Sequence, residues 1–252
     1  MLTEDWTISA RNPGADIDHV IYGLTKTGDT PSDKAILMAH GLGCTQHMAA
    51  FPEATSKFLQ KGYDVIHFEM NGMDSLSRPP ASVNLETFAD DVTTVASYFR
   101  PKYKKLYAVG HSYGGTALIL ANPEIEAASL WDAAYGLPED QDWVRDFVAW
   151  VDDDHFTPSW NEDITLHRQL LDVEATYTRA KCAELSRVCC FPVQSLLAEN
   201  FTEETNGESF DTHSPHPASC RKRYNEQDHF FEDDPEARED MIAQTIAFFE
   251  KH

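Results

Sequence analysis

The stretch LYAVGHSYGG, residues 106–115, indicates how the rest of the chain is organised. Its first four residues have the length and apolar character of a buried strand, and residues 113–121 continue as an apolar helix. Between them, residues 110–114 match Gly-x-Ser-x-Gly, the sharp turn that exposes a serine between a strand and a helix. Glycines at such a turn remove the Cβ atoms that would collide with neighbouring backbone. The sequence therefore predicts that Ser112 is a nucleophile at the carboxyl end of a strand.

Short apolar runs alternate with amphipathic stretches on both sides of this motif. This alternation is typical of βαβ units that build a mostly parallel sheet. We expect strands at residues 6–10, 19–25, 35–39, 63–68, 106–109, 127–131, 193–198 and 220–224. We expect helices at residues 46–60, 85–99, 113–121 and from residue 235 onward. Asn84 and Asp234 are suitable N-cap residues for the second and the last of these helices, and Pro235 suits a first helical position.

Residues 137–190 interrupt the alternation, because only a helical periodicity is visible there. We interpret this segment as a small helical lid inserted into a single domain that spans residues 1–252. Trp143, Phe147 and Trp150 would line the mouth of an apolar substrate pocket if they face inward, or would only pack the lid onto the sheet.

A serine hydroxyl needs an imidazole base to act as a nucleophile at neutral pH. His229 lies after the last expected strand and before the last helix, where a base that follows the serine in the chain is expected. The turn His40-Gly41-Leu42-Gly43 follows an earlier strand, and His40 itself is expected to be a structural hydrogen-bonding residue. We predict that the backbone N–H groups of Leu42 and Tyr113 form an oxyanion hole.

The segments AHGLG at 39–43, FEMNGMD at 68–74 and GHSYGG at 110–115 together resemble the α/β-hydrolase superfamily. The resemblance implies an α/β fold with an eight-stranded, mostly parallel sheet flanked by helices, and a triad of serine, histidine and an acid. The chain departs from the family after its fourth strand, where Glu69 and Asp74 replace an aspartate and a glycine that are common there.

The resemblance does not fix which residue is the acid. In the family the acid usually follows the seventh strand, and the corresponding position here holds Phe201. Glu199, Glu203 and Glu204 lie close by and could serve if this loop is remodelled. A second family arrangement places the acid directly after the sixth strand, where this chain has Asp132. We regard Asp132 as the best single candidate and leave the glutamates open.

Composition excludes several classes of function. The 42 acidic and 20 basic side chains give a net charge of −22, which opposes binding to nucleic acid or to an anionic membrane surface. The five cysteines are scattered, and the beginning of the chain does not resemble a secretion signal, so we expect a cytoplasmic protein. We expect no cofactor and no metal, since the consecutive residues 152–155 (Asp-Asp-Asp-His) cannot converge on one ion. A homodimer is left open.

The charge is concentrated in two segments. Residues 139–174 hold 11 acidic and 2 basic side chains and residues 199–240 hold 13 and 4, which accounts for 18 of the 22 excess negative charges. This concentration is typical of a solvated surface, and it would also disfavour anionic substrates near the site. We therefore expect a serine hydrolase for a small neutral carboxylic ester or lactone. Thioester cleavage, C–C bond hydrolysis, hydroxynitrile lysis and a non-catalytic ligand-binding role are the alternatives.

Overall fold

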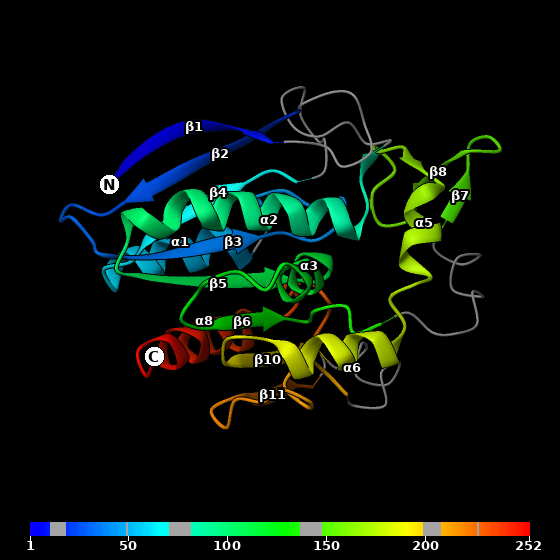
Figure 1. Cartoon of the computed structure of the whole chain (residues 1–252). Coiled ribbons are helices and arrows are strands. Elements are labelled where there is room, and N and C mark those ends of the chain that lie inside the picture. Colours follow the sequence, from blue (N-terminus) through cyan, green and yellow to red (C-terminus); the bar gives the residue numbers. More distant parts are fainter. Residues whose placement is uncertain (11–18, 49, 71–81, 137–147, 199–207, 226) are drawn as a thin grey trace.

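The computed structural model describes residues 1–252 except 11–18, 49, 71–81, 137–147, 199–207 and 226. Its centre is an eight-stranded sheet with the strand order β1-β2-β4-β3-β5-β6-β10-β11 (Figure 1). The strands are β1 (Leu2–Ala10), β2 (His19–Thr27), β3 (Lys34–Ala39), β4 (Asp64–Phe68), β5 (Lys105–His111), β6 (Ala128–Trp131), β10 (Val193–Ala198) and β11 (Cys220–Tyr224). The pairs β1–β2 and β2–β4 are antiparallel, and all other neighbours are parallel. The expected mostly parallel sheet is confirmed.

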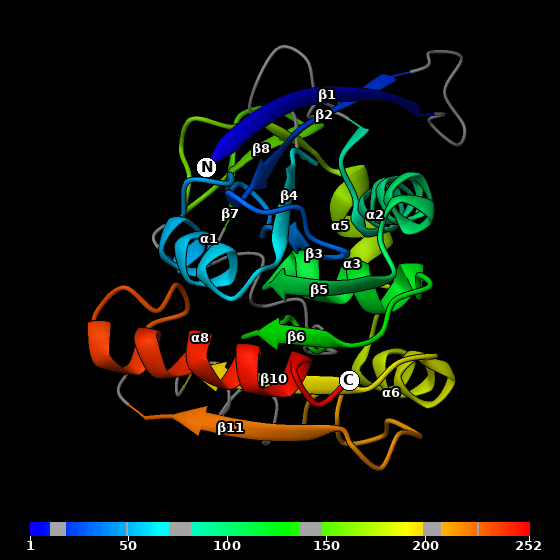
Figure 2. The same ribbon diagram turned by 90° about the vertical axis from the view of Figure 1, so that its left-hand side faces the viewer.

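Helices cover both faces of the sheet (Figure 2). The helices α1 (Ala50–Gln60) and α8 (Pro235–Phe249) lie on one face, while α2 (Leu85–Phe99), α3 (Tyr113–Ala121) and α6 (Arg179–Val188) lie on the other. Each face has its own apolar core, with Phe51, Phe58 and Met241 buried on the first side and Phe88 and Leu118 on the second. Because both faces are covered, the central strands β3, β4, β5 and β6 are almost completely buried and mostly apolar.

Two helix starts agree with the predicted caps. The Oδ1 atom of Asn84 accepts the N–H of Thr87 at 2.9 Å, and the Asn84 N–H donates to Thr87 Oγ1 at 3.0 Å, which completes a capping box at α2. Asp234 Oδ1 accepts the N–H groups of Glu236 and Ala237 at the start of α8. Within the described ranges, no helix is long and apolar enough to cross a membrane.

The segment between β6 and β10 differs from the prediction of helices alone. It contains a three-stranded antiparallel sheet of β7 (Val148–Trp150), β8 (His155–Pro158) and β9 (Leu166–His167), followed by α5 (Gln169–Glu174) and α6. Figure 1 shows β7, β8 and α5 beyond the carboxyl ends of the central parallel strands, whereas α6 lies beside β10. The helical prediction is therefore wrong for residues 148–167.

The reason for this difference lies in local contacts. The Asp152 side chain accepts the backbone N–H groups of Asp154 and His155, both at 2.8 Å, and so stabilises the turn between β7 and β8. In β8 burial alternates with a period of two, which places Phe156 in the core. The Trp150 side chain is half exposed and packs edge-on against Phe156. The other two aromatic residues of the predicted pocket, Trp143 and Phe147, lie outside the described residues.

Candidate active site

Ser112 connects β5 to α3 and has an unusual backbone conformation. Its φ is 53° and its ψ is −124°, a region that costs a non-glycine residue conformational energy. Neighbouring contacts hold this conformation, because the Ser112 N–H donates to the carbonyl of Trp131 at 3.0 Å and the Ser112 carbonyl accepts the N–H of Ala134 at 3.2 Å. A methyl group on Gly114 would lie 2.3 Å from the carbonyl oxygen of His40. The glycine predicted from the motif therefore lets the turn pack against the chain that follows β3.

His229 approaches Ser112 from the loop that follows β11. Its Nε2 atom lies 2.8 Å from the Ser112 Oγ atom, although 117 residues separate the two in sequence. This distance is within the range for an O–H to N hydrogen bond, and it lets the imidazole accept the serine proton. The structure thus brings together the predicted nucleophile and the predicted base.

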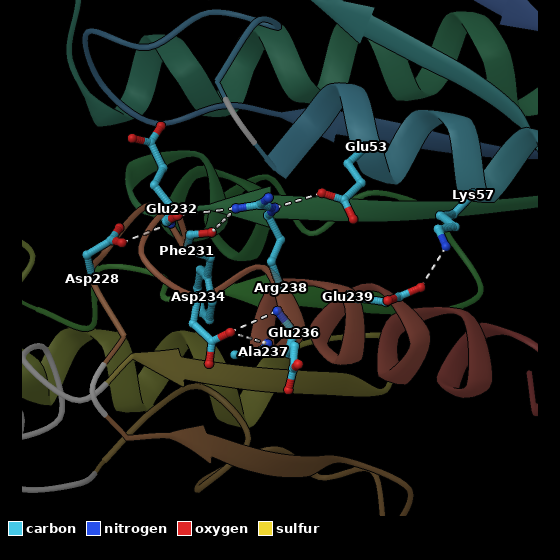
Figure 3. A network of polar contacts seen from close by, with 10 residues as sticks. All are labelled: Glu53, Lys57, Asp228, Phe231, Glu232, Asp234, Glu236, Ala237, Arg238 and Glu239. Atoms are coloured by element: carbon cyan, nitrogen blue, oxygen red, sulfur yellow. Dashed lines mark hydrogen bonds and ion pairs between the residues drawn. The ribbon is translucent and has the colours of Figure 1, made fainter.

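The Asp228 carboxylate shapes the turn that carries His229. It accepts the backbone N–H of Phe230 at 2.5 Å and those of Glu232 and Asp233, both at 2.8 Å. Because one carboxylate accepts three N–H groups, the turn immediately after His229 is compact. Figure 3 shows the hydrogen bond from the Glu232 N–H to the Asp228 carboxylate.

Arg238 of α8 holds the same loop from the other side. Its Nη1 atom donates to the carbonyls of Phe231 at 2.9 Å and Glu232 at 3.4 Å, while its Nε atom pairs with Glu53 Oε2 of α1 at 2.8 Å (Figure 3). Phe231 has a φ of 56° and is fully buried, so its backbone needs such support. The loop that bears His229 is therefore fixed by charged side chains rather than by a sheet.

Asp132 follows β6 and contacts the far side of the His229 ring. Its Oδ2 atom lies 2.6 Å from His229 Nδ1, and its Oδ1 atom accepts the N–H of Ala198 at 2.9 Å. The Asp132 side chain is completely buried. Burial raises the pKa of Asp132, and the hydrogen bond to His229 opposes that increase. The structure therefore joins the candidate acid Asp132 to His229.

The alternative acids Glu199, Glu203 and Glu204 lie outside the described residues. Because Asp132 Oδ2 occupies the Nδ1 side of the ring and Ser112 occupies the Nε2 side, both ring nitrogens of His229 already have partners. The Asp132 carboxylate can only accept a proton, so Nδ1 carries the N–H of the neutral ring. The lone pair of Nε2 then faces the Ser112 hydroxyl and can accept its proton.

His111, at the variable position of the serine motif, is a site residue for which the sequence predicted no role. Its Nε2–H donates to the backbone carbonyl of His229 at 2.9 Å, and the two rings lie 4.8 Å apart. The side chain is fully buried, and burial together with the charge of His229 lowers the pKa of His111 to about 3. His111 therefore stays neutral and acts as a hydrogen-bond donor. Its position directly before the serine is the signal that could have identified it.

The predicted oxyanion-hole residues, Leu42 and Tyr113, belong to segments that border Ser112. Tyr113 is the first residue of α3, where backbone N–H groups have no carbonyl of the preceding turn to bind. A methyl group on Gly41 would lie 3.1 Å from the Ser112 Cβ atom, so the loop that contains Leu42 packs against Ser112. His40 is fully buried and its Nδ1–H donates to the Gly41 carbonyl at 2.9 Å, as expected for a structural residue.

Cys44 lies at the end of this loop. Burial raises the pKa of its thiol to about 11, with a smaller contribution from the charge of Glu232. A thiol with such a pKa is protonated at neutral pH and is a poor nucleophile. Within the part of the chain that the structure describes, no three His, Cys, Asp or Glu side chains are grouped as ligands for a metal ion.

The central sheet, the flanking helices and the strained serine between β5 and α3 define an α/β-hydrolase fold. The chain belongs to the alpha/beta hydrolase family, whose sequence model matches residues 36–247. No curated protein sequence gives a significant match.

Solved structures with this fold cover nearly the whole chain at low identity. A putative hydrolase from Agrobacterium vitis S4 is 13% identical, with a TM-score of 0.76 over 98% of this chain and 99% of that one. Est1E from Butyrivibrio proteoclasticus, in complex with ferulic acid, is 13% identical, with a TM-score of 0.69 over 96% and 99%. A thermostable carboxyl esterase from Bacillus coagulans is 11% identical, with a TM-score of 0.72 over 100% and 99%. The family match supports hydrolase activity, and the solved structures support the fold.

Proposed function

We propose that this protein is a serine hydrolase that cleaves small neutral carboxylic esters or lactones through an acyl-enzyme on Ser112. The observation that carries the proposal is the chain of contacts from Ser112 Oγ to His229 Nε2 at 2.8 Å and from His229 Nδ1 to Asp132 Oδ2 at 2.6 Å. Acyl transfer through a serine requires that the nucleophile and the base lie within hydrogen-bond distance. It also requires a third group that orients the base.

The proposed reaction has two steps. Ser112 Oγ attacks the carbonyl carbon while His229 Nε2 takes the hydroxyl proton, and the N–H groups of Leu42 and Tyr113 stabilise the negative oxygen. His229 then gives its proton to the departing alcohol, which leaves an ester on Ser112. A water molecule, deprotonated by His229, hydrolyses this ester and restores the serine. Asp132 keeps the Nδ1 proton of His229 in place throughout.

The preference for neutral substrates rests on charge near the site. Glu232 lies close enough to Cys44 to contribute to its raised pKa, and Asp228 and Asp233 belong to the loop that carries His229. A site bordered by carboxylates repels an anionic substrate and favours the departure of a carboxylate product. Replacing Glu232 and Asp233 by Gln and Asn should reduce the preference for neutral over anionic esters, and an unchanged preference would contradict this part of the proposal.

A fluorophosphonate probe and short-chain p-nitrophenyl esters test the reaction. The wild type should be labelled at Ser112 and should hydrolyse the esters, and Ser112→Ala should abolish labelling and lower kcat by about 10⁴-fold or more. Ester turnover that survives Ser112→Ala would refute the mechanism. A protein that neither labels nor turns over esters would instead support the ligand-binding alternative, and thioester, C–C and hydroxynitrile substrates in the same assay separate the remaining reaction types.

A further inference from the structure

The insertion between β6 and β10 makes direct hydrogen bonds to the loop after β3. In the turn between β8 and β9, the Nε1–H of Trp160 donates to the Leu42 carbonyl at 3.0 Å, and the Nδ2–H of Asn161 donates to the Gly43 carbonyl at 2.7 Å. Gly43 has a φ of 72°, and a methyl group there would lie 3.1 Å from the Cδ1 atom of Ile164. The turn therefore packs closely on this loop and is not a distant cover.

The insertion also contacts the first residue of α3. The Tyr113 hydroxyl donates to Glu174 Oε1 of α5, and the Tyr113 ring packs edge-on against Phe88 with 5.0 Å between centroids. Glu174 is buried, and burial raises the pKa of its carboxyl to about 8. At neutral pH this carboxyl is mostly protonated, so the contact does not require a buried charge.

The contacts at Leu42 restrain both of its peptide groups. The Gly41 carbonyl, which belongs to the same peptide as the Leu42 N–H, accepts His40 Nδ1–H at 2.9 Å and the N–H of Cys44 at 3.1 Å. The next peptide is restrained through its carbonyl by Trp160. A trans peptide is planar, with its C=O and N–H on opposite sides, so the contacts to the Gly41 oxygen fix the direction of the Leu42 N–H. The contact of Trp160 fixes the peptide plane on the other side of the Leu42 Cα atom, which limits rotation of the Leu42 backbone.

We propose that Trp160, Asn161 and Glu174 are positioning residues that hold the N–H groups of Leu42 and Tyr113 in place for the oxyanion. This inference rests on the proposed function and assigns the insertion a part in catalysis beyond covering the site. Donors that are already oriented before the reaction stabilise a developing charge without reorganisation, whereas a loosely held donor loses most of that benefit.

The Trp160 contact is tested by Trp160→Phe, which keeps an aromatic ring and removes the indole N–H. The matched control is Trp6→Phe, which removes the indole N–H that Trp6 of the edge strand β1 donates to Thr25 Oγ1 at 3.1 Å. With a p-nitrophenyl ester, Trp160→Phe should lower kcat about tenfold with little change in KM, since loss of a whole oxyanion donor costs about 10²–10³-fold. The control should stay within twofold of the wild type.

The Glu174 contact is tested by Glu174→Leu, with Glu174→Gln as the conservative variant that keeps a hydrogen-bond partner for Tyr113. Glu174→Leu should lower kcat several-fold, and Glu174→Gln should restore most of it at pH 7. Tyr113→Phe removes the same bond from the other side and serves if Glu174→Leu does not fold.

A second readout separates positioning from a general loss of structure. Phenylboronic acid forms a reversible tetrahedral adduct with an active-site serine, so its Ki should rise by the same factor as kcat falls in Trp160→Phe and Tyr113→Phe. If both variants match the Trp6→Phe control in kcat and Ki, or if the loss appears in KM alone, the inference is wrong while the proposed function stands. If the wild type itself neither turns over esters nor labels at Ser112, the proposed function fails and the inference fails with it.

Discussion

Ser112 and Asp132 are held in a different way from their common partner, His229. The first two follow buried strands and have backbone hydrogen bonds to neighbouring strands, including the Ser112 N–H to the Trp131 carbonyl and the Asp132 N–H to the Leu196 carbonyl at 2.8 Å. Both have positive φ angles, of 53° and 47°. His229 lies on a loop and depends on polar side chains.

The site therefore combines residues held by the backbone of the sheet with a residue held by side-chain hydrogen bonds. Strand ends in a doubly covered sheet are fixed by the core and by the β-ladder, so they can carry strained backbone. A loop lacks a ladder and has to be fixed by side chains, which here are Asp228 and Arg238 (Figure 3). The insertion is attached to the site in the second way as well, through Trp160, Asn161 and Glu174.

The largest effect should come from the strand-held acid. Asp132→Asn keeps the side-chain shape but offers His229 Nδ1 an amide, which favours the wrong tautomer of the ring. We expect kcat to fall by about 10⁴-fold with intact folding. Ester kinetics and circular dichroism measure this, and a rate within a few-fold of the wild type would mean that another acid orients His229.

The buried carboxyl of the insertion should give a pH-dependent effect on stability. Its pKa is about 8 in the folded protein and near 4.5 when unfolded, so the folded state binds the proton more tightly. The wild type should therefore lose stability between pH 4.5 and pH 8, and Glu174→Gln should not share this loss. The stability of Glu174→Gln relative to the wild type should rise by roughly 4 kcal/mol from pH 5 to pH 9 in urea unfolding.

The groups around Glu174 provide a check on this expectation. Tyr113 donates to it, and the nearby Tyr177 hydroxyl donates to Glu86 at 3.3 Å. The pKa values of Tyr113 and Tyr177 are raised, so both hydroxyls stay neutral between pH 5 and pH 9. Of these three groups, Glu174 is therefore the one that changes charge in this range. A difference between the two proteins that is the same at pH 5 and pH 9 would contradict the raised pKa.

A smaller effect should follow when the support of the His229 loop is weakened. Arg238→Met removes the donors to the carbonyls of Phe231 and Glu232. We expect about a tenfold fall in kcat, because His229 no longer stays aligned with Ser112. The control is Lys57→Met, since the Lys57–Glu239 pair also links α1 to α8 but is exposed and lies away from the loop (Figure 3). Equal rates in the two variants would show that the loop does not need Arg238.

Much of this site is visible in the sequence because the relevant signals are local. The motif around Ser112 combines a strand, a glycine turn and a helix within residues 106–121, so nearest-neighbour sterics are sufficient to predict it. The choice of acid was harder. Asp132 and Ala198 are 66 residues apart, and they meet because the sheet pairs β6 with β10, which holds Asp132 where it contacts His229.

The insertion was predicted less well. Its aromatic residues have a spacing that fits a helix, and short strands such as β7, with three residues, leave too few positions for a period of two to be recognised. The contacts of Trp160 and Glu174 have no sequence signal at all, because their partners lie in the loop after β3 and at the start of α3.

By itself, the sequence determined the alternation of strands and helices, the serine turn and the place of the histidine, since these depend on periodicity, capping and turn chemistry within short segments. The tertiary structure decided which carboxylate reaches His229, how charged side chains hold its loop, and where the insertion contacts Leu42 and Tyr113. Those features depend on distances between segments far apart in the chain, which exist only when the sheet has assembled.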